Sequence, residues 1–197
     1  RPGALDPRIR RESAERIAQS LAIAPYFRPR AVVCHACFDE RYYVSAEEQW
    51  LDNSIETWRG LLPAAEDADT VICLENVYER EPLHLRRLLE AVASPRLRFC
   101  FDTGHFNISS AVPLKSWIDE MAPWLSHVHL HDNGGMRDEH LPVGEGTFPF
   151  AEFFAHLRER SLRPILTVES HSERDLWRML DNLDALRLLD GWEDDRS

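Results

Sequence analysis

The chain has 197 residues, a net charge of -11 at pH 7 and 44% hydrophobic residues. This length predicts one domain, or slightly less than one if the fold is large, and the hydrophobic content is too high for a disordered chain. The negative net charge argues against nonspecific binding of nucleic acid, and no apolar run is long enough to span a bilayer.

Helix-like and strand-like segments alternate along the whole chain. Asp6 and Pro7 predict the first helix start, with Asp as the N-cap and Pro at the first helical position. The expected helices are 7–24, 45–62, 82–93, 113–121, 149–160 and 173–189. The expected strands are 31–36, 71–75, 97–102, 127–131 and 165–169. This alternation predicts βαβ units and a parallel sheet, which is either doubly wound or closed into a TIM barrel.

Each expected strand ends on a potential metal ligand. These ligands are His35, Glu75, Asp102, His129 and Glu169. Because side chains alternate between the faces of a strand, the ligands share one face with smaller residues, and large apolar residues occupy the other. The large residues are Val32, Ile72, Leu74, Phe99, Phe101, Val128, Leu130, Leu166 and Val168. This pattern is typical of a barrel with its site at the carboxyl ends of the strands.

A doubly wound sheet fits these strand ends less well. It would gather its polar groups at one switch point, usually beside a glycine-rich phosphate loop, and the sequence contains neither GxGxxG nor GxxxxGK. One polar residue at a strand end is more often a cap than a ligand. Several convergent carboxylates, however, repel one another unless a cation compensates, and mixed carboxylate and imidazole ligands suit Mn, Mg, Zn, Co or Fe.

Five motifs that follow the strands occur in a fixed order. They are Leu74-Glu75-Asn76, residues 101–105 (FDTGH), residues 127–133 (HVHLHDN), residues 138–146 (DEHLPVGEG) and Val168-Glu169-Ser170. The ordered set resembles the xylose isomerase-like TIM barrel superfamily. That superfamily includes sugar phosphate isomerases and epimerases as well as AP endonuclease family 2, the endonuclease IV type. The resemblance covers essentially the whole chain.

The resemblance implies specific roles for these residues. The implied core metal ligands are Glu75, Asp102, His129 and Glu169. Glu75 and Glu169 would also be the catalytic pair that transfers the proton, and His105 would contact the substrate. In the hydrolytic branch, the additional metal ligands would be His35, His105, Asp138 and His140. The implied cofactor is a divalent ion, Mn, Mg, Zn or Co, present as one ion or as two or three.

The family barrel has eight strands, whereas this sequence predicts strands that match only the last five. We therefore expect residues 1–192 to form an incomplete TIM (β/α)8-type barrel with its N-terminal units missing, in a fragment or a natural truncation. Residues 193–197 are expected to form a flexible tail. An open wall of five strands would expose its sheet edges and half of its interior.

Several other residues allow two interpretations. Cys34 and Cys37 form a CxxC pattern, which suggests a redox or zinc site, but incidental core thiols in a reducing cytoplasm are the simpler interpretation. His131 is either a ligand or a satisfied polar group at the barrel mouth. Arg137 either binds an anionic group of the substrate or is a solvated loop charge.

Aromatic residues and the segment after the fourth strand complete the expectations. The tryptophans are expected to pack between elements, and Trp50 and Phe38 lie near enough to the mouth to line a substrate pocket. Asp132 and Asn133 are expected to orient the loop that carries Asp138.

Three functions remain open at this point. The first is a metal-dependent isomerase or epimerase of a sugar or sugar phosphate, with a Glu pair for proton transfer and a small sugar-like substrate. The second is a multinuclear-metal phosphoester hydrolase related to endonuclease IV, acting on a small phosphodiester because a basic stripe for DNA is absent. The third is a non-catalytic barrel remnant. A membrane partner is not expected, and a homo-oligomer is left open.

Overall fold

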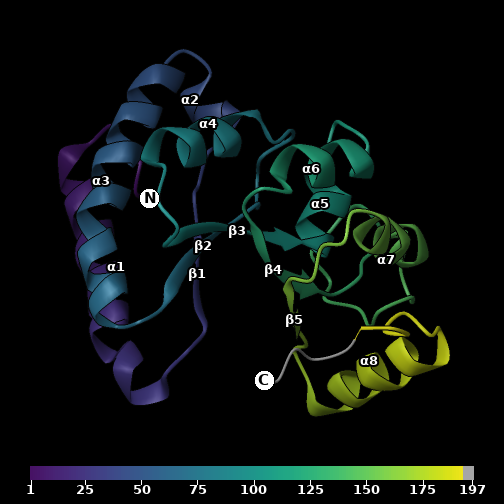
Figure 1. Ribbon diagram of the computed structural model, residues 1–197. Coiled ribbons are helices and arrows are strands. Elements are labelled where there is room, and N and C mark those ends of the chain that lie inside the picture. The colour runs from purple at the N-terminus through teal and green to yellow at the C-terminus, as the bar shows by residue number, and fades with distance from the viewer. Residues whose placement is uncertain (193–197) are drawn as a thin grey trace.

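The computed structural model describes residues 1–192, which form one parallel sheet with helices packed against one of its faces (Figure 1). The strands are β1 (Ala31–His35), β2 (Val71–Glu75), β3 (Leu97–Asp102), β4 (Leu125–Leu130) and β5 (Ile165–Val168). The helices are α1 (Pro7–Phe27), α2 (Glu40–Tyr43), α3 (Glu47–Asp67), α4 (Leu83–Val92), α5 (Thr103–Ser109), α6 (Leu114–Met121), α7 (Phe150–Glu159) and α8 (Glu173–Ala185). The predicted tail, residues 193–197, lies outside the described residues.

The strand order identifies the type of sheet. All pairs are parallel, and the order is β1-β2-β3-β4-β5, so every crossover moves to the next strand in the same direction. A doubly wound sheet reverses direction at a switch point, and a TIM barrel does not. The prediction of an incomplete barrel with five strands is therefore confirmed. Within residues 1–192, β1 and β5 each pair along one edge only.

The two faces of the sheet follow the predicted alternation. On the outer face, Ile72, Leu74 and Phe99 are fully buried beneath the helices. The Phe101 ring on the same face stacks on Phe153 of α7, with ring centroids 5.4 Å apart. On the inner face, His35 and Thr167 near the sheet edges are exposed. The apolar face therefore supplies most of the packing energy, about 1.5–3 kcal/mol for each large side chain fully buried.

Two helices continue beyond the proline at which the sequence predicts their end. The helix α1 extends past Pro25 to Phe27, and α3 extends past Pro63 to Asp67. A proline removes one N–H and disturbs one turn, but the residues after it can still donate. Here Arg28 N–H bonds to the carbonyl of Ala24, and Ala68 N–H bonds to that of Ala64. The predicted ends at 24 and 62 were therefore too early.

The strand β4 begins two residues earlier than predicted. Leu125 pairs with Phe99, and the register then shifts so that His127 pairs with Cys100. The irregularity places one extra residue, Ser126, between the two pairs. A bulge of this kind breaks the simple alternation from which the prediction was made. After it, Asp102 lies opposite His129, so the ligand positions are aligned as expected.

The structure corrects the expectations for three aromatic residues. Trp50 and Phe38 are fully buried and pack edge to face, with ring centroids 4.9 Å apart, so they belong to the hydrophobic core. Trp177 on α8 is 58% exposed, which is incompatible with a core packing role. No helix among residues 1–192 combines the length and the apolar character that crossing a membrane requires.

Candidate metal and active site

Four predicted ligands converge at the carboxyl ends of the strands. The Nδ1 atom of His129 lies 2.9 Å from Glu75 Oε1 and 3.0 Å from Glu169 Oε1. Asp102 Oδ2 lies 3.7 Å from the same nitrogen. The four side chains come from β2, β3, β4 and the residue directly after β5, so the parallel sheet itself brings them together.

The electrostatics of this core favour a bound cation. Burial by itself raises the pKa of Glu75, but hydrogen bonds with His129 and His35 outweigh it and leave the pKa lowered. Burial likewise opposes ionisation of Asp102, yet contacts with His129 and His131 lower its pKa. Burial lowers the pKa of His129, and hydrogen bonds with Asp102, Cys100 and Glu75 raise it well above its usual range.

The balance of these charges is a test of whether the residues fit a metal. Three carboxylates surround the imidazole of His129, and protonation of His129 and of the neighbouring His35 offsets part of their negative charge. A divalent cation would take over that role and suits a set of mixed carboxylate and imidazole ligands. One oxygen of Asp102, one nitrogen of His129 and one oxygen of Glu169 lie within 4.8 Å of one another. The residues therefore fit a divalent metal ion.

His35 lies on the opposite side of Glu75 from His129. Its Nε2 atom is 3.1 Å from Glu75 Oε2, so the two oxygens of Glu75 contact two different imidazoles. Contacts with Cys37 and Glu75 raise the pKa of His35 to about 10. The structure thus places the predicted outer ligand His35 beside the core.

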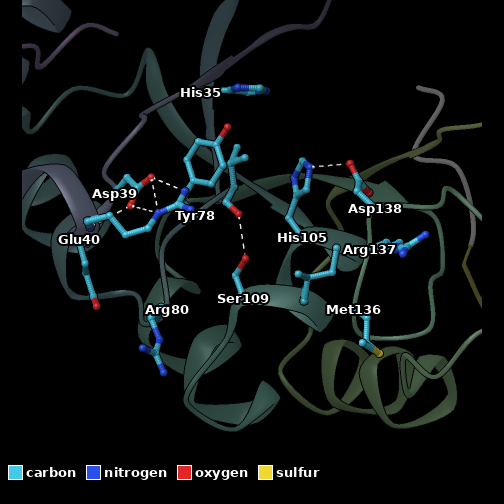
Figure 2. A pocket seen from close by; sticks show the side chains of 13 residues that line it. His35, Asp39, Glu40, Tyr78, Arg80, His105, Ser109, Met136, Arg137 and Asp138 are labelled. Carbon is cyan, nitrogen blue, oxygen red and sulfur yellow. Dashed lines mark hydrogen bonds and ion pairs between the residues drawn. The ribbon is translucent and has the colours of Figure 1, made fainter.

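A second set of predicted residues meets at the carboxylate of Asp138. Its Oδ2 atom lies 3.4 Å from His105 Nε2 (Figure 2). The same oxygen lies 3.3 Å from His140 Nε2. His105 is held by α5, whose N-cap is Asp102, and the Asp102 carboxylate accepts a hydrogen bond from His105 N–H at 2.7 Å. Three of the four residues named as additional metal ligands, His105, Asp138 and His140, are therefore adjacent.

A third group, His131, His140 and Glu169, also has ligand atoms within 4.8 Å of one another. The two imidazole rings stack in parallel, with centroids 3.8 Å apart and an interplanar angle of 3°. The nitrogen lone pairs lie in the ring planes, so parallel rings cannot both direct them at one ion. This group is not a metal site as it stands.

The loop between β4 and α7, which carries Asp138 and His140, is organised by a buried carboxylate. Asp132 is fully buried and accepts hydrogen bonds from the backbone N–H groups of Asn133, Gly144, Gly146 and Phe148, at 2.8–3.1 Å. It also pairs with Leu141 through its backbone in both directions. The expectation that Asp132 orients this loop agrees with these contacts.

We expect Asp132→Asn to lower the free energy of unfolding by about 3 kcal/mol. The new amide group would present donors to backbone donors and leave buried N–H groups without an acceptor. Thermal or urea unfolding measures the loss, and hydrogen exchange should show reduced protection of residues 133–148. Asp190→Asn is the control, because Asp190 pairs with Arg187 on the exposed surface. Equal stability of both variants would contradict this role.

A cavity of about 690 Å³ adjoins His35 and His105 (Figure 2). His35, His105 and Asp138 form one part of its wall, and Arg41 and Tyr78 are among the other lining residues. Arg137 lies on its rim, with its side chain directed away from the His105 ring in Figure 2. The role of Arg137 in substrate binding thus stays a prediction.

Several residues that shape this cavity were not predicted from the sequence. Glu79 is buried, and its carboxylate accepts hydrogen bonds from the N–H groups of Phe38, Val77 and Tyr78. It thereby ties the loop after β1 to the loop after β2, and burial raises its pKa. Arg41 is held by Asp39. The only signal for these residues was their position shortly after a strand end, which applies equally to many solvated residues.

The four cysteines carry no disulfide. Cys73 and Cys100 are buried in the sheet. Burial raises the pKa of Cys34 to about 12 and that of Cys73 to about 11, so both are inert thiols near neutral pH. Of the CxxC pattern, Cys34 therefore fits the interpretation of an incidental core thiol.

Comparisons with known proteins agree with this geometry. The family described as "Xylose isomerase-like TIM barrel" matches residues 1–191. A solved structure of a D-tagatose 3-epimerase-like protein superposes with a TM-score of 0.83 and 26% identity, covering 97% of this chain and 73% of that chain. Fructoselysine 3-epimerase of Escherichia coli O157:H7 is 31% identical over 109 residues, which are 55% of this chain and 37% of the enzyme.

Longer matches are found to uncharacterized proteins of Methanocaldococcus jannaschii. One of these is 28% identical over 181 residues, which are 88% of this chain. The match spans 62% of that protein's length, so this chain corresponds to less than two thirds of it.

Proposed function

Because the chain belongs to the xylose isomerase-like TIM barrel family, we propose that it acts as a divalent-metal-dependent isomerase or epimerase of a sugar or sugar phosphate. One observation carries this proposal. Glu75 and Glu169 come from the non-adjacent strands β2 and β5, and both approach the same nitrogen of His129. Two carboxylates that face one shared space suit the removal and return of a proton. The two relatives named as 3-epimerases support the choice of a sugar.

Each group at the site has a separate proposed role in the reaction. A divalent cation bound in the core supplies polarisation of the substrate carbonyl and its neighbouring hydroxyl. Glu75 is proposed as the base because it faces the shared space, and hydrogen bonds with His129 and His35, which lower its pKa, keep its carboxylate ionised. Glu169, which is about one third exposed, is proposed to deliver a proton to the opposite side. His105 lines the adjoining cavity, where it would contact a hydroxyl of the substrate.

The loop after β4 is proposed to limit access of water to this space. Asp138 and His140 on that loop lie against His105 and Glu169. The buried Asp132 holds the loop in place. Exclusion of water protects an ene-diolate from side reactions and strengthens the electrostatic contacts around it.

The test is hydrogen exchange from solvent during turnover. With D-tagatose or D-allulose as the probe, in D2O and with Mn2+, we expect an epimer that carries one deuterium at the carbon that changes configuration. Proton NMR and mass spectrometry measure the label. A folded, metal-loaded chain that forms neither an epimer nor an exchanged substrate, across ketoses and ketose phosphates, would contradict the proposal and favour the non-catalytic remnant.

A second candidate, a phosphoester hydrolase, is favoured by the outer residues. Asp138 Oδ2 lies between His105 and His140, and His35 contacts Glu75, so the chain offers ligands for more than one ion. Such a centre supplies hydroxide at neutral pH. Hydrolysis of a small phosphodiester that is lost in His140→Ala, without deuterium in any sugar, would establish this alternative. The net charge of -11 argues against DNA as its substrate.

A further inference from the structure

His131 is a fully buried histidine that the proposed chemistry does not use. Its Nε2 atom lies 3.0 Å from both Oδ1 and Oδ2 of Asp102. The backbone of His131 is fixed as well, because Thr103 Oγ1 accepts from its N–H at 3.1 Å and donates to its carbonyl at 2.7 Å. The ring therefore contacts the Asp102 carboxylate from a rigid place on the inner side of the sheet.

The space for this ring is made by Gly104. A Cβ atom at position 104 would lie 2.0 Å from His131 Cε1 and 2.4 Å from its Nδ1, far inside van der Waals contact. Gly104 lies in α5, and its backbone is not among those with a positive φ. Glycine is a poor helix residue, so neither helix formation nor backbone conformation explains it. Its lack of a side chain is what allows the imidazole to reach Asp102.

The contact restrains the orientation of Asp102. Asp102 Oδ1 accepts a hydrogen bond from His105 N–H at 2.7 Å, and the His131 ring contacts both oxygens. With both oxygens occupied on one side, Oδ2 is directed toward His129, 3.7 Å away in the core. Rotation of the carboxylate would break at least one of these contacts.

The other side of the same ring contacts the loop after β4. His131 stacks on His140, with ring centroids 3.8 Å apart, and its Nδ1 lies 3.7 Å from Asp138 Oδ1. One imidazole thus contacts a core ligand and two loop residues. The order of the loop and the direction of the Asp102 carboxylate are thereby linked through His131.

We propose that His131 is a positioning residue, which orients Asp102 as a metal ligand and requires Gly104 for its place. The proposal rests on the proposed metal site but not on which reaction occurs there. Hydrogen-bonded partners of metal ligands commonly change metal affinity by about 10-fold to 100-fold when they are replaced. His131 is proposed to have an effect of that size although it binds no substrate.

The test measures Mn2+ affinity of the purified 197-residue chain by isothermal titration, without substrate. We expect His131→Leu, which has no donor, to weaken binding about 10-fold to 100-fold. Gly104→Ala keeps the imidazole but displaces it, and should weaken binding to a similar extent. His131→Gln retains an N–H donor and should recover part of the affinity. Circular dichroism confirms that each variant is folded, and if His131→Leu does not fold, Gly104→Ala and His131→Gln decide.

A matched control is available on α7. His156 is also buried, and its Nε2 lies 2.9 Å from Asp119 Oδ1, so His156→Gln disturbs a comparable imidazole–carboxylate pair that lies between the helices α7 and α6 and not at the strand ends. It should leave Mn2+ affinity within about twofold of the wild type.

The outcomes separate the two proposals. Equal affinity of His131→Leu, Gly104→Ala and His156→Gln would overturn the role of His131 and leave the metal site intact. If the wild-type chain binds no Mn2+, Co2+ or Zn2+, the metal site and the role of His131 both fail. Epimerase activity that is absent from a chain with normal metal binding would count against the proposed function alone.

Discussion

Replacement of Glu75 or Glu169 by glutamine is expected to lower kcat for epimerisation by about 10²-fold to 10⁴-fold. Glutamine has nearly the same size and keeps a carbonyl oxygen near His129, but it cannot take up a proton from carbon. Initial rates with saturating metal and substrate measure the loss. Glu12→Gln is the control, because Glu12 lies exposed on α1 and pairs with Arg16 of the same helix. It should leave the rate unchanged.

Glu75→Gln and Glu169→Gln should differ in the epimer with which each still exchanges hydrogen, a difference that a single shared base would not produce. If each glutamate serves one face of the substrate carbon, each variant loses epimerisation but still exchanges hydrogen with one of the two epimers. Exchange of each pure epimer with D2O measures this directly. If one variant exchanged hydrogen with neither epimer while the other variant still exchanged with both, one glutamate would be the only base. Full activity in both variants would remove the whole site assignment.

The fold could be predicted because two patterns agree along the chain: residues alternate between two faces within each strand, and strands alternate with helices. Residues such as Ile72 and Phe99 alternate with Cys73 and Cys100, and the helices between them return each strand parallel to the last. In a parallel sheet the carboxyl ends lie together, so a ligand at each strand end was sufficient to predict convergence. The bounds of β2 and β3 were predicted to the residue for the same reason.

The errors arise where contacts distant in the sequence decide the structure. Trp50 and Phe38 pack against each other with His84 from α4, and nothing local distinguishes such packing from a pocket wall. Glu79 looks like a solvated loop charge until the backbone N–H of Phe38, forty-one positions earlier, is placed beside it. The bulge that shifts β4 depends on the partner strand in the same way.

The partner of His131 could not be predicted from the sequence either. Its position after β4 allowed either a ligand or a satisfied polar group, and the pairing with Asp102 depends on Gly104 two residues further along from that aspartate. A glycine near the start of a helix gives no sign of which ring will occupy its space. In the structure, the short distance between position 104 and the His131 ring identifies that ring. The roles of Gly104 and His131 can therefore be tested together.

Removal of divalent metal is expected to abolish turnover and to lower the melting temperature by about 5–10 °C. An ion held at about 100 times its dissociation constant stabilises the folded state by about 2.7 kcal/mol, which corresponds to a shift of this size for a chain of this length. The physical reason is the group formed by the buried Glu75 and Asp102 and the partly exposed Glu169, whose mutual repulsion a divalent cation offsets. Dialysis against a chelator, followed by readdition of Mn2+, Co2+ or Zn2+, measures both effects in one preparation.

Variants then assign the stabilisation to the core rather than to the acidic surface. Asp102→Asn should lose most of the metal-dependent shift, because Asp102 is fully buried at the centre of the group. His156→Gln should melt at a lower temperature and yet keep the shift, since its partner Asp119 belongs to another part of the molecule. Sodium chloride at equal ionic strength should not replace the divalent ion, because screening acts on exposed charges far more than on buried ones. A shift of equal size in Asp102→Asn and the wild type would mean that the ion binds elsewhere, and the proposed core would then have to be abandoned.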